Sequence, residues 1–580
     1  MQKSNIFKNL AFYKKQAILG PLFKLLEASF ELFVPLVVSD IIDNGIANND
    51  FKYILSRFAI LFLLALIGLV CSVTAQYFSA KAAVGFATKT RQDLFNKIEA
   101  LDFSSLDTIG ASSLINKMTS NINQVQTGVN LVLRLFLRSP FVVFGAMIMA
   151  FTISVKIAWI FTLMILILSL IVFGIMLISI PLNKNVQEKS DKILSLTREN
   201  LIGTRVLRAF NKQEDEKQTF KTHNDLLSKS QKFVGNISGA LNPLTFVCVN
   251  MFIVWLIYLG AIQVNLGNIS QGNVIALYNY MTQILVELVK LANLIIQITK
   301  SFASKHRIES VLNHQNTLIQ NNNLNNFEQK EYEPLISFKN VSVKYPNNQE
   351  TSLSNISFDV FSGQTIGIIG GTGSGKSTLV NLIPHFYDTQ EGDIFYKGEN
   401  LKNIDTTYLR NKIGMVMQKN ALFEGTIKDN LLIGNPIASD EDLVNALKTS
   451  QSYDFVFSKD ENLLFNLKQG GANLSGGQKQ RLCIARALVK KPEILILDDR
   501  FSSLDYKTDL LLRTALKNLP YNLTQIIVTQ RTSSILNADQ IIVLDDGKMV
   551  GLGTHEFLLN NCEVYKEIHY SQYKGVKDEK

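Results

Sequence analysis

Residues 366–377 read IGIIGGTGSGKS, a short apolar run followed by a glycine-rich loop. The apolar run predicts a buried strand, and the loop matches the pattern GxxxxGK followed by Ser or Thr, which opens a helix. Glycines let the loop backbone turn its N–H groups inward around phosphate oxygens, and the helix N-terminus adds positive potential. The stretch therefore predicts an α/β domain that binds a nucleoside triphosphate.

Two side chains of this loop carry chemistry of their own. Lys376 is expected to reach the β and γ phosphates, and the Ser377 hydroxyl is expected to ligate Mg²⁺. The nucleotide-binding residues predicted from the loop and the helix start are Gly370, Gly371, Thr372, Gly373, Ser374, Gly375, Lys376, Ser377 and Thr378.

Two further motifs follow the loop. LSGGQ occupies residues 474–478, and ILILD occupies residues 494–498. The second is an apolar strand that ends in a carboxylate, Asp498, which is placed to hold Mg²⁺ through water. Taken alone, Ser-Gly-Gly is a flexible turn and Asp498 a strand-end acid, but neither interpretation predicts both motifs at these distances from a phosphate-binding loop.

The N-terminal half has a different composition. Only 18% of the 580 residues are charged, against about 25% in a typical soluble protein, and apolar runs crowd the first half. Six of these runs reach the roughly 20 residues that cross a bilayer. They lie near 17–42, 58–80, 131–153, 157–180, 243–264 and 274–298.

The basic residues predict how these spans are oriented. The N-terminus and the long connections 81–130 and 183–240 are rich in Lys and Arg, whereas 263–273 contains neither. The positive-inside rule therefore places the N-terminus, both connections and the C-terminal domain in the cytoplasm, as part of a multi-pass protein of the cell membrane. The net charge of +9 fits the same rule, so no nucleic-acid partner is predicted.

Ionisable residues interrupt the spans. A charge near the bilayer centre costs about 3 kcal/mol or more, so each is expected to face a partner or a wet cavity. The spacings Lys24/Glu27 and Glu287/Lys290 allow ion pairs on one helix face. The competing interpretation is that Glu27, Glu31 and Glu287 contact a cationic amphiphilic substrate.

Composition also divides the chain. Residues 312–335 are polar and rich in Asn and Gln, which suits a connector. From residue 336 onward, short β-rich runs alternate with glycine turns and helices. The predicted domains are a transmembrane domain (1–311), a linker (312–335) and a nucleotide-binding domain (336–580).

With LSGGQ unchanged and in register with the other motifs, the sequence resembles the ABC exporters that fuse six spans to one nucleotide-binding domain. The resemblance covers nearly the whole chain. It implies a multidomain membrane protein: an all-α six-helix transmembrane domain with cytoplasmic helix extensions, plus an α/β P-loop ATP-binding-cassette domain. It also implies ATP and Mg²⁺ as cofactors and ATP-driven export as the activity.

The resemblance assigns further residues. Tyr345 matches the aromatic that stacks on adenine, and Gln418 matches the Q-loop glutamine that contacts Mg²⁺ and the membrane domain. Ser502 and Asp505 lie in SSLD, which resembles the D-loop. In the membrane half, residues 101–109 and 208–215 resemble the two coupling helices. The Mg²⁺ ligands implied in this way are Ser377, Gln418 and Asp498.

Two positions depart from the family pattern. Asp498 matches the family's Walker B aspartate, which is normally followed by Glu but is followed here by Asp499. The family's switch histidine, which contacts the γ-phosphate, is replaced by Gln530. Aspartate is one methylene shorter, and a misplacement near 1 Å can cost about 100-fold in rate. Glutamine donates a hydrogen bond but cannot carry the positive charge of histidine. The chain's own site is therefore expected to bind ATP and hydrolyse it slowly.

In the family, each ATP lies between one chain's phosphate loop and the other chain's LSGGQ motif, which is called the signature. The intact signature would therefore serve a partner's ATP, which implies half of a heterodimeric exporter of small amphiphilic, drug-like compounds in the lipid bilayer. The alternatives are a homodimeric exporter of lipid or peptide and a nucleotide-gated membrane protein that does not pump. The signature residues are Leu474, Ser475, Gly476, Gly477 and Gln478.

Overall fold

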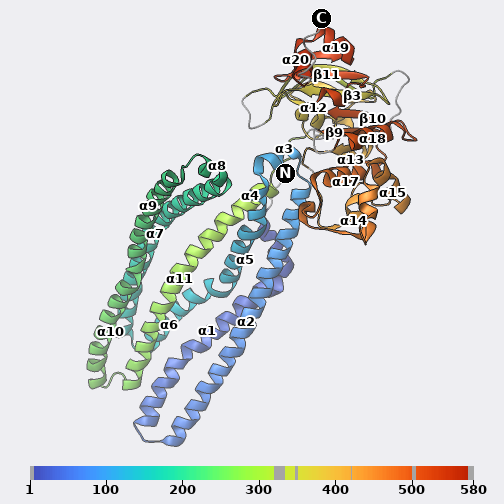
Figure 1. The fold of residues 1–580 in the computed structure, drawn as a ribbon. Helices are drawn as coiled ribbons and strands as arrows, with labels where there is room; N and C mark the ends of the chain where they lie inside the picture. Colours follow the sequence, from blue (N-terminus) through green and yellow to red (C-terminus); the bar gives the residue numbers. More distant parts are fainter. Residues whose placement is uncertain (1–4, 319–332, 346–349, 420, 499–504, 573–580) are drawn as a thin grey trace. The chain divides into compact units, whose positions relative to one another are not determined.

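The computed structural model describes residues 5–318, 333–345, 350–419, 421–498 and 505–572. The chain forms two compact units, a helical unit 1 (1–100 and 112–314) and a mixed α/β unit 2 (101–111 and 315–580) (Figure 1). The short segment 101–111 lies inside the membrane half of the sequence but packs with unit 2. The domain ranges 1–311, 312–335 and 336–580 remain our proposal, because most of the linker lies outside the described residues.

Long helices dominate unit 1, as the predicted helical extensions of the spans require. The helix α2 has 49 residues, which at about 1.5 Å per residue gives a length of about 73 Å. A bilayer core is only about 30 Å thick, so much of α2 extends beyond it. The elements are η1 (Ile6–Tyr13), α1 (Lys14–Asp40), η2 (Ile41–Ile46), α2 (Phe51–Glu99), α4 (Ala111–Asn116), η3 (Lys117–Asn121), α5 (Ile122–Leu131), η4 (Val132–Phe136), α6 (Arg138–Ile153), α7 (Val155–Ile202), α8 (Thr204–Ala209), α9 (Gln213–Gly239), α10 (Leu241–Asn265) and α11 (Gln271–Leu312).

Within the described residues, five helical segments are long and apolar enough to cross a membrane, and each contains one predicted span. They are Phe51–Glu99, Ala111–Ile153, Val155–Ile202, Gln213–Asn265 and Gln271–Leu312. The remaining predicted span, 17–42, coincides with α1 and the start of η2. Lys24, Glu27 and Glu31 lie close together in α1 and make it less apolar than the other five, so its assignment as a span stays a prediction.

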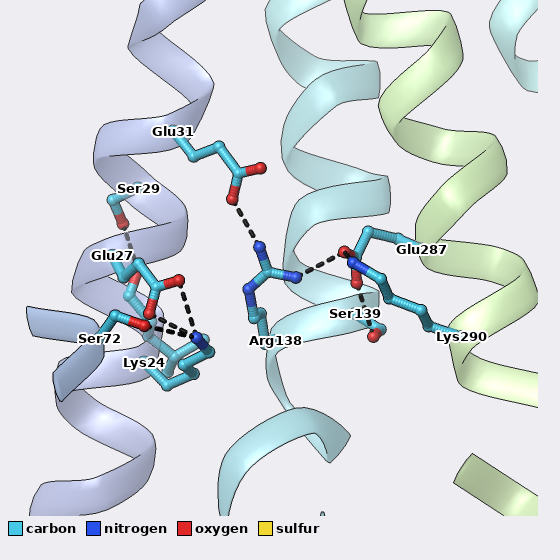
Figure 2. Close-up of polar contacts among 10 residues, drawn as sticks. Lys24, Glu27, Ser29, Glu31, Ser72, Arg138, Ser139, Glu287 and Lys290 are labelled. Atoms are coloured by element: carbon cyan, nitrogen blue, oxygen red, sulfur yellow. Dashed lines mark hydrogen bonds and ion pairs between the residues drawn. The ribbon is translucent and has the colours of Figure 1, made fainter. Parts of the chain in front are cut away.

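Ion pairs join several of the charges inside the helical unit. The predicted pairs at i and i+3 are confirmed, with Lys24 Nζ 2.5 Å from Glu27 Oε2 and Lys290 Nζ 2.9 Å from Glu287 Oε1. Arg138 on α6 also bridges two other helices: Nη1 lies 2.5 Å from Glu287 Oε1 on α11, and Nη2 lies 2.6 Å from Glu31 Oε2 on α1 (Figure 2). The cluster joins α1, α6 and α11 through a buried charge.

Unit 2 is built on a six-stranded sheet in the order β12-β11-β3-β10-β9-β6. Its strands β3, β6, β9, β10 and β11 run parallel and β12 is antiparallel. A four-stranded sheet (β2-β1-β4-β5) and a two-stranded one (β7-β8) complete the described strands. The strands are β1 (Ile336–Val343), β2 (Leu353–Val360), β3 (Thr365–Gly370), β4 (Glu391–Tyr396), β5 (Glu399–Asn400), β6 (Ile413–Val416), β7 (Gly425–Thr426), β8 (Asn466–Leu467), β9 (Ile494–Asp498), β10 (Thr524–Val528), β11 (Gln540–Asp545) and β12 (Lys548–Gly553).

The central strands are buried along their whole length because both faces of the parallel sheet are covered. All five residues of β9 and all five of β10 are buried. The helices of the unit are α3 (Phe103–Ile109), α12 (Lys376–Leu382), α13 (Thr406–Lys412), α14 (Ile427–Leu432), α15 (Asp440–Thr449), α16 (Tyr453–Phe457), α17 (Gly476–Val489), α18 (Tyr506–Lys517), α19 (His555–Asn561) and α20 (Glu563–Gln572), with 3-10 turns η5 (Leu401–Asn403), η6 (Asn462–Leu464), η7 (Gln469–Gly471) and η9 (Thr532–Ser534).

Candidate functional site

The glycine-rich loop connects the end of β3 to the start of α12, as the strand–loop–helix pattern predicts. Gly373 and Gly375 have φ angles of 86° and 95°, a region where a side chain is strained. Lys376 is only 7% exposed, and its ammonium lies within the loop, donating to the carbonyls of Gly370 at 3.0 Å and Gly371 at 2.6 Å. The loop therefore holds a buried cation, which suits a polyphosphate.

Two of the predicted magnesium ligands, Ser377 and Asp498, lie together beside this loop. The Ser377 hydroxyl on α12 lies 3.3 Å from Asp498 Oδ1 at the end of β9. Gln418 follows β6, which pairs in parallel with β9, so it emerges at the same edge of the sheet. Hydroxyl, carboxylate and amide oxygens are the ligands that Mg²⁺ prefers. These residues fit the ion, which would neutralise phosphate charge when bound.

Tyr345 lies next to the start of α12. Its hydroxyl is 3.3 Å from Thr378 Oγ1, and its ring meets the ring of Tyr387 edge-on, with centroids 5.0 Å apart and an interplanar angle of 87°. Two predicted site residues that are 33 positions apart in the sequence are thereby brought together. A tyrosine in this place can contact the base of a nucleotide whose phosphates lie in the loop.

The LSGGQ motif forms the N-terminus of α17 instead of part of the phosphate loop. Ser475 caps the helix: its hydroxyl accepts from the N–H of Gln478 at 3.3 Å, and Gln478 Oε1 accepts from the N–H of Ser475 at 3.0 Å. Leu474 is buried and holds the turn on the core, whereas Ser475 and Gly476 are exposed. An exposed, capped helix N-terminus is suited to an anion that a second molecule brings to it.

The switch position lies beside the phosphate loop. Gln530 follows β10, the strand next to β3, and its side-chain amide donates to Thr372 Oγ1 at 3.4 Å. Asp505 caps α18 by accepting from the Thr508 N–H at 3.1 Å, and it also accepts from the Thr508 hydroxyl at 2.7 Å; these hydrogen bonds lower the pKa of Asp505. The predicted site residues Asp499 and Ser502 lie outside the described residues.

Comparison with known proteins agrees with this geometry. The family model described as the ABC transporter transmembrane region matches residues 17–288, and the model described as ABC transporter matches residues 353–502. The Bacillus subtilis protein YfiB, an uncharacterized ABC transporter ATP-binding protein, is 32% identical over 98% of this chain and 98% of its own length. The chain belongs to the ABC transporter family.

Other ABC transporters are similar over nearly the same length. An uncharacterized ABC transporter ATP-binding protein of Mycobacterium tuberculosis is 31% identical over 97% of this chain and 96% of its own length. The solved structure of a bacterial Atm1-family ABC exporter with ATP bound superposes with a TM-score of 0.81 at 20% identity, covering 97% of this chain and 99% of that chain. This protein is therefore an ATP-binding, multi-pass membrane transporter with the ABC exporter fold.

The first predicted coupling helix corresponds to α3, which begins at Phe103 instead of Leu101 because Asp102 caps it. The helix makes two contacts with the nucleotide-binding core. The ring of Phe103 stacks on Phe386 with centroids 4.1 Å apart, and Tyr387 donates a hydrogen bond to Asp107 Oδ2 at 2.6 Å. Burial and the Asp107 carboxylate both raise the pKa of Tyr387, so it remains a donor at neutral pH.

Asp102 also ties α3 to the start of the linker. Its carboxylate accepts from Thr317 Oγ1 at 2.8 Å, from the Leu318 N–H at 3.0 Å and from the Ser105 N–H at 2.8 Å. Burial opposes the charge, but these hydrogen bonds prevail and lower the pKa of Asp102 to about 2. No sequence motif marks the contact of Asp102 with the linker or that of Asp107 with Tyr387, because these partners are 215 to 280 positions apart.

The second predicted coupling helix, residues 208–215, is corrected by the structure. The short helix is α8, Thr204–Ala209, and residues 210–212 form a turn before α9. Asn211 takes a left-handed φ of 51°, which ends the helix. The family resemblance predicted a helix over 208–215, whereas the short helix starts at Thr204 and ends at Ala209.

A further residue near the switch position escaped the sequence analysis. Gln572, at the end of α20, donates through Nε2 to the Gln530 carbonyl at 2.6 Å, and its Oε1 accepts from the Thr532 N–H at 3.0 Å. His569 of the same helix lies 3.1 Å from the Thr532 hydroxyl. The C-terminal helix α20 thus holds both sides of the loop that carries Gln530.

Proposed function

We propose that this chain is one half of a heterodimeric ABC exporter for amphiphilic, drug-like compounds. Its own ATP site binds Mg²⁺-ATP and hydrolyses it slowly, and its intact signature completes the partner's competent site. ATP binding would close the two nucleotide-binding domains, coupling helices would transmit the closure, and hydrolysis at the partner's site would reset the cycle.

The position of Gln530 carries the proposal. Its amide lies at the phosphate loop, 3.4 Å from Thr372 Oγ1, where the family's histidine contacts the γ-phosphate. An amide can hold ATP by hydrogen bonding but cannot carry the charge of an imidazolium. The neighbouring departure, Asp499, shortens the carboxylate that should polarise water, and a shift near 1 Å costs about 100-fold. Both changes favour binding over hydrolysis.

Two exposed surfaces support the proposal that this chain binds a second one. The N-terminus of α17 is open at Ser475 and Gly476, as expected of a signature that serves another chain's ATP. The tip formed by α7, α8 and α9 exposes several large apolar side chains outside the predicted spans. Its exposed side chains are Leu201 (72%), Ile202 (81%), Val206 (59%) and Phe210 (74%). Apolar groups gathered in this way mark a protein interaction site.

The charges in the spans limit how the chain could select cargo. All three carboxylates are in ion pairs, but the side chains of Glu287 and Glu27 are only 4% and 17% exposed, whereas that of Glu31 is 41% exposed. Of these three carboxylates, Glu31 is therefore the best placed to meet a cationic amphiphile. We further propose that the N-terminus and the nucleotide-binding domain lie on the cytoplasmic side of the cell membrane, following the positive-inside rule.

The test begins with assembly. The tagged chain is purified from its native membrane, copurifying ABC chains are identified, and photoreactive ATP is trapped with vanadate at each site of the complex. We expect trapping mainly at the partner's site. The double substitution Asp499→Glu, Gln530→His should increase trapping at this chain's site, whereas Ser475→Ala should suppress it at the partner's site.

Several outcomes would contradict the proposal. Brisk ATP hydrolysis at two equivalent sites by the chain alone would establish a homodimer. Unchanged trapping in the double variant would refute the slow-site explanation. In vesicles containing the complex, ATP-dependent passive flux without accumulation of a fluorescent amphiphile would favour a gated pathway over a pump, and transport of lipid or peptide instead would correct the cargo.

A further inference from the structure

A cavity of about 340 Å³ lies in unit 1 between η1, the α5–η4 segment and α11. Its walls include Phe7 and Leu10 of η1, Val129 and Leu133 of the α5–η4 segment, and Ile298 of α11. The volume falls at the lower end of the range found for small-molecule sites, roughly 300–1,000 Å³. The space is therefore large enough for a ligand or for part of one.

The walls offer no hydrogen bond to a polar ligand. The lining hydroxyl, that of Ser301, donates to the backbone carbonyls of Gln124 at 2.8 Å and Gln297 at 3.0 Å, so it is turned toward the helices. The other lining side chains are hydrocarbon or aromatic, apart from Gly128. Such a cavity favours an apolar occupant over water.

The cavity lies where two predicted spans meet their cytoplasmic boundary. One of these spans starts at residue 131 and the other ends at residue 298, and both ends line the cavity. On its rim, Val132 is 36% exposed and Phe136 is 45% exposed, so apolar surface continues outward toward lipid. The rim segment η4 is π-helical, a departure from regular helix that is frequent at functional sites.

The helix η1 covers the cavity and has the character of a helix that lies in a membrane interface. Its inner side is fixed: Ile6 is 3% exposed, and the Ile6 N–H donates to Glu309 Oε1 at 3.1 Å. On its other side Phe12 is 72% exposed, and Lys8 within the helix and Lys14 just after it are exposed. An apolar ring beside lysines at the cytoplasmic surface suits anionic lipid.

We propose that this cavity binds one acyl chain of an anionic phospholipid from the cytoplasmic leaflet, whose headgroup meets Lys8 of η1 and the exposed Lys14 and Lys15 just after it. The apolar walls accept the chain, and the cations select the headgroup. This inference does not depend on whether the transporter is a heterodimer or on the state of its ATP site.

The test uses the full-length chain in vesicles. Leu133→Trp, in a Trp159→Phe, Trp255→Phe background, reports on the cavity through quenching by lipids with brominated acyl chains. We expect brominated phosphatidylglycerol to quench at a mole fraction at least threefold lower than brominated phosphatidylcholine. Replacing Lys8, Lys14 and Lys15 together by Gln should abolish that difference.

A second arm fills the cavity. Val129→Phe should weaken quenching by both lipids, whereas the matched control Val247→Phe, at an exposed position (59%) on α10, should leave it unchanged. The lysine variant changes only exposed side chains, so the comparison of the two lipids still tests the proposal even if Val129→Phe fails to fold.

Three results would overturn the proposal. Equal quenching by the two lipids in the chain with its lysines intact would remove headgroup selection. If Val129→Phe folds and quenching by both lipids is the same as without this substitution, the probe senses bulk lipid and not a chain in the cavity. If a soluble amphiphile displaces the brominated chain and the cavity shows no preference between the two lipids, the cavity binds cargo instead of lipid.

Discussion

Replacing Tyr387 by Phe should loosen helix α3, the first predicted coupling helix, from the nucleotide-binding core. The hydroxyl of Tyr387 donates to Asp107 at 2.6 Å, and its ring packs edge-on against Tyr345, the residue predicted to contact adenine. Phenylalanine keeps the ring and removes only the hydroxyl. The substitution therefore isolates one hydrogen bond between α3 and the wall of the nucleotide site.

The size of the effect follows from the kind of bond. A hydrogen bond to a charged group contributes about 1.5–3 kcal/mol, and the lower value applies because Asp107 is exposed. A loss of about 1.4 kcal/mol is a tenfold change in an equilibrium constant. We expect the local opening of α3 to become about tenfold more frequent.

Hydrogen–deuterium exchange of the backbone amides in residues 103–109 measures this opening directly and requires no known cargo. Exchange there should accelerate about tenfold in Tyr387→Phe. The matched control is Tyr396→Phe, which removes a hydroxyl bonded to Glu493 at 2.8 Å in the antiparallel sheet. If α3 exchanges at the wild-type rate in Tyr387→Phe, or equally fast in the control, the contact does not hold the helix.

Three further changes test other contacts. Asp102→Asn should destabilise the junction of α3 and the linker by about 2 kcal/mol, because the pKa of Asp102 is lowered to about 2. The charged carboxylate contributes this stability fully above the unfolded pKa near 4, and the contribution is lost as pH falls toward 2. Hydrogen exchange of α3 measured against pH should therefore show this loss in the wild type but not in Asp102→Asn. Arg138→Met should leave Glu287 buried without its arginine and lower the free energy of unfolding by roughly 3–5 kcal/mol. The double variant Arg138→Met, Glu287→Gln should recover part of this loss. Equal melting temperatures of the wild type and the single variant would contradict this prediction. Gln572→Ala should free the loop that carries Gln530 and speed release of ATP from this chain's site, whereas an unchanged release rate would show that α20 does not hold the loop.

Local sequence patterns predicted much of the architecture. The strand–loop–helix at 366–377, the capped turn of LSGGQ and five of the spans each depend on neighbouring residues, whose spacing determines a strand, a cap or a helix. The pairs Lys24–Glu27 and Glu287–Lys290 were also predictable because i and i+3 side chains meet on any helix. The second coupling helix was misplaced because its end depends on the left-handed turn at Asn211.

What the sequence determined by itself is the chemistry of the ATP-binding domain and its union with a membrane domain, since both are encoded in short contiguous motifs. Only the tertiary structure decided which distant groups meet. Arg138 joins Glu31 and Glu287 across three helices, Tyr387 meets Asp107 from 280 positions away, and Gln572 reaches Gln530. Such contacts depend on how packed elements bring remote segments together, and no local periodicity records that arrangement.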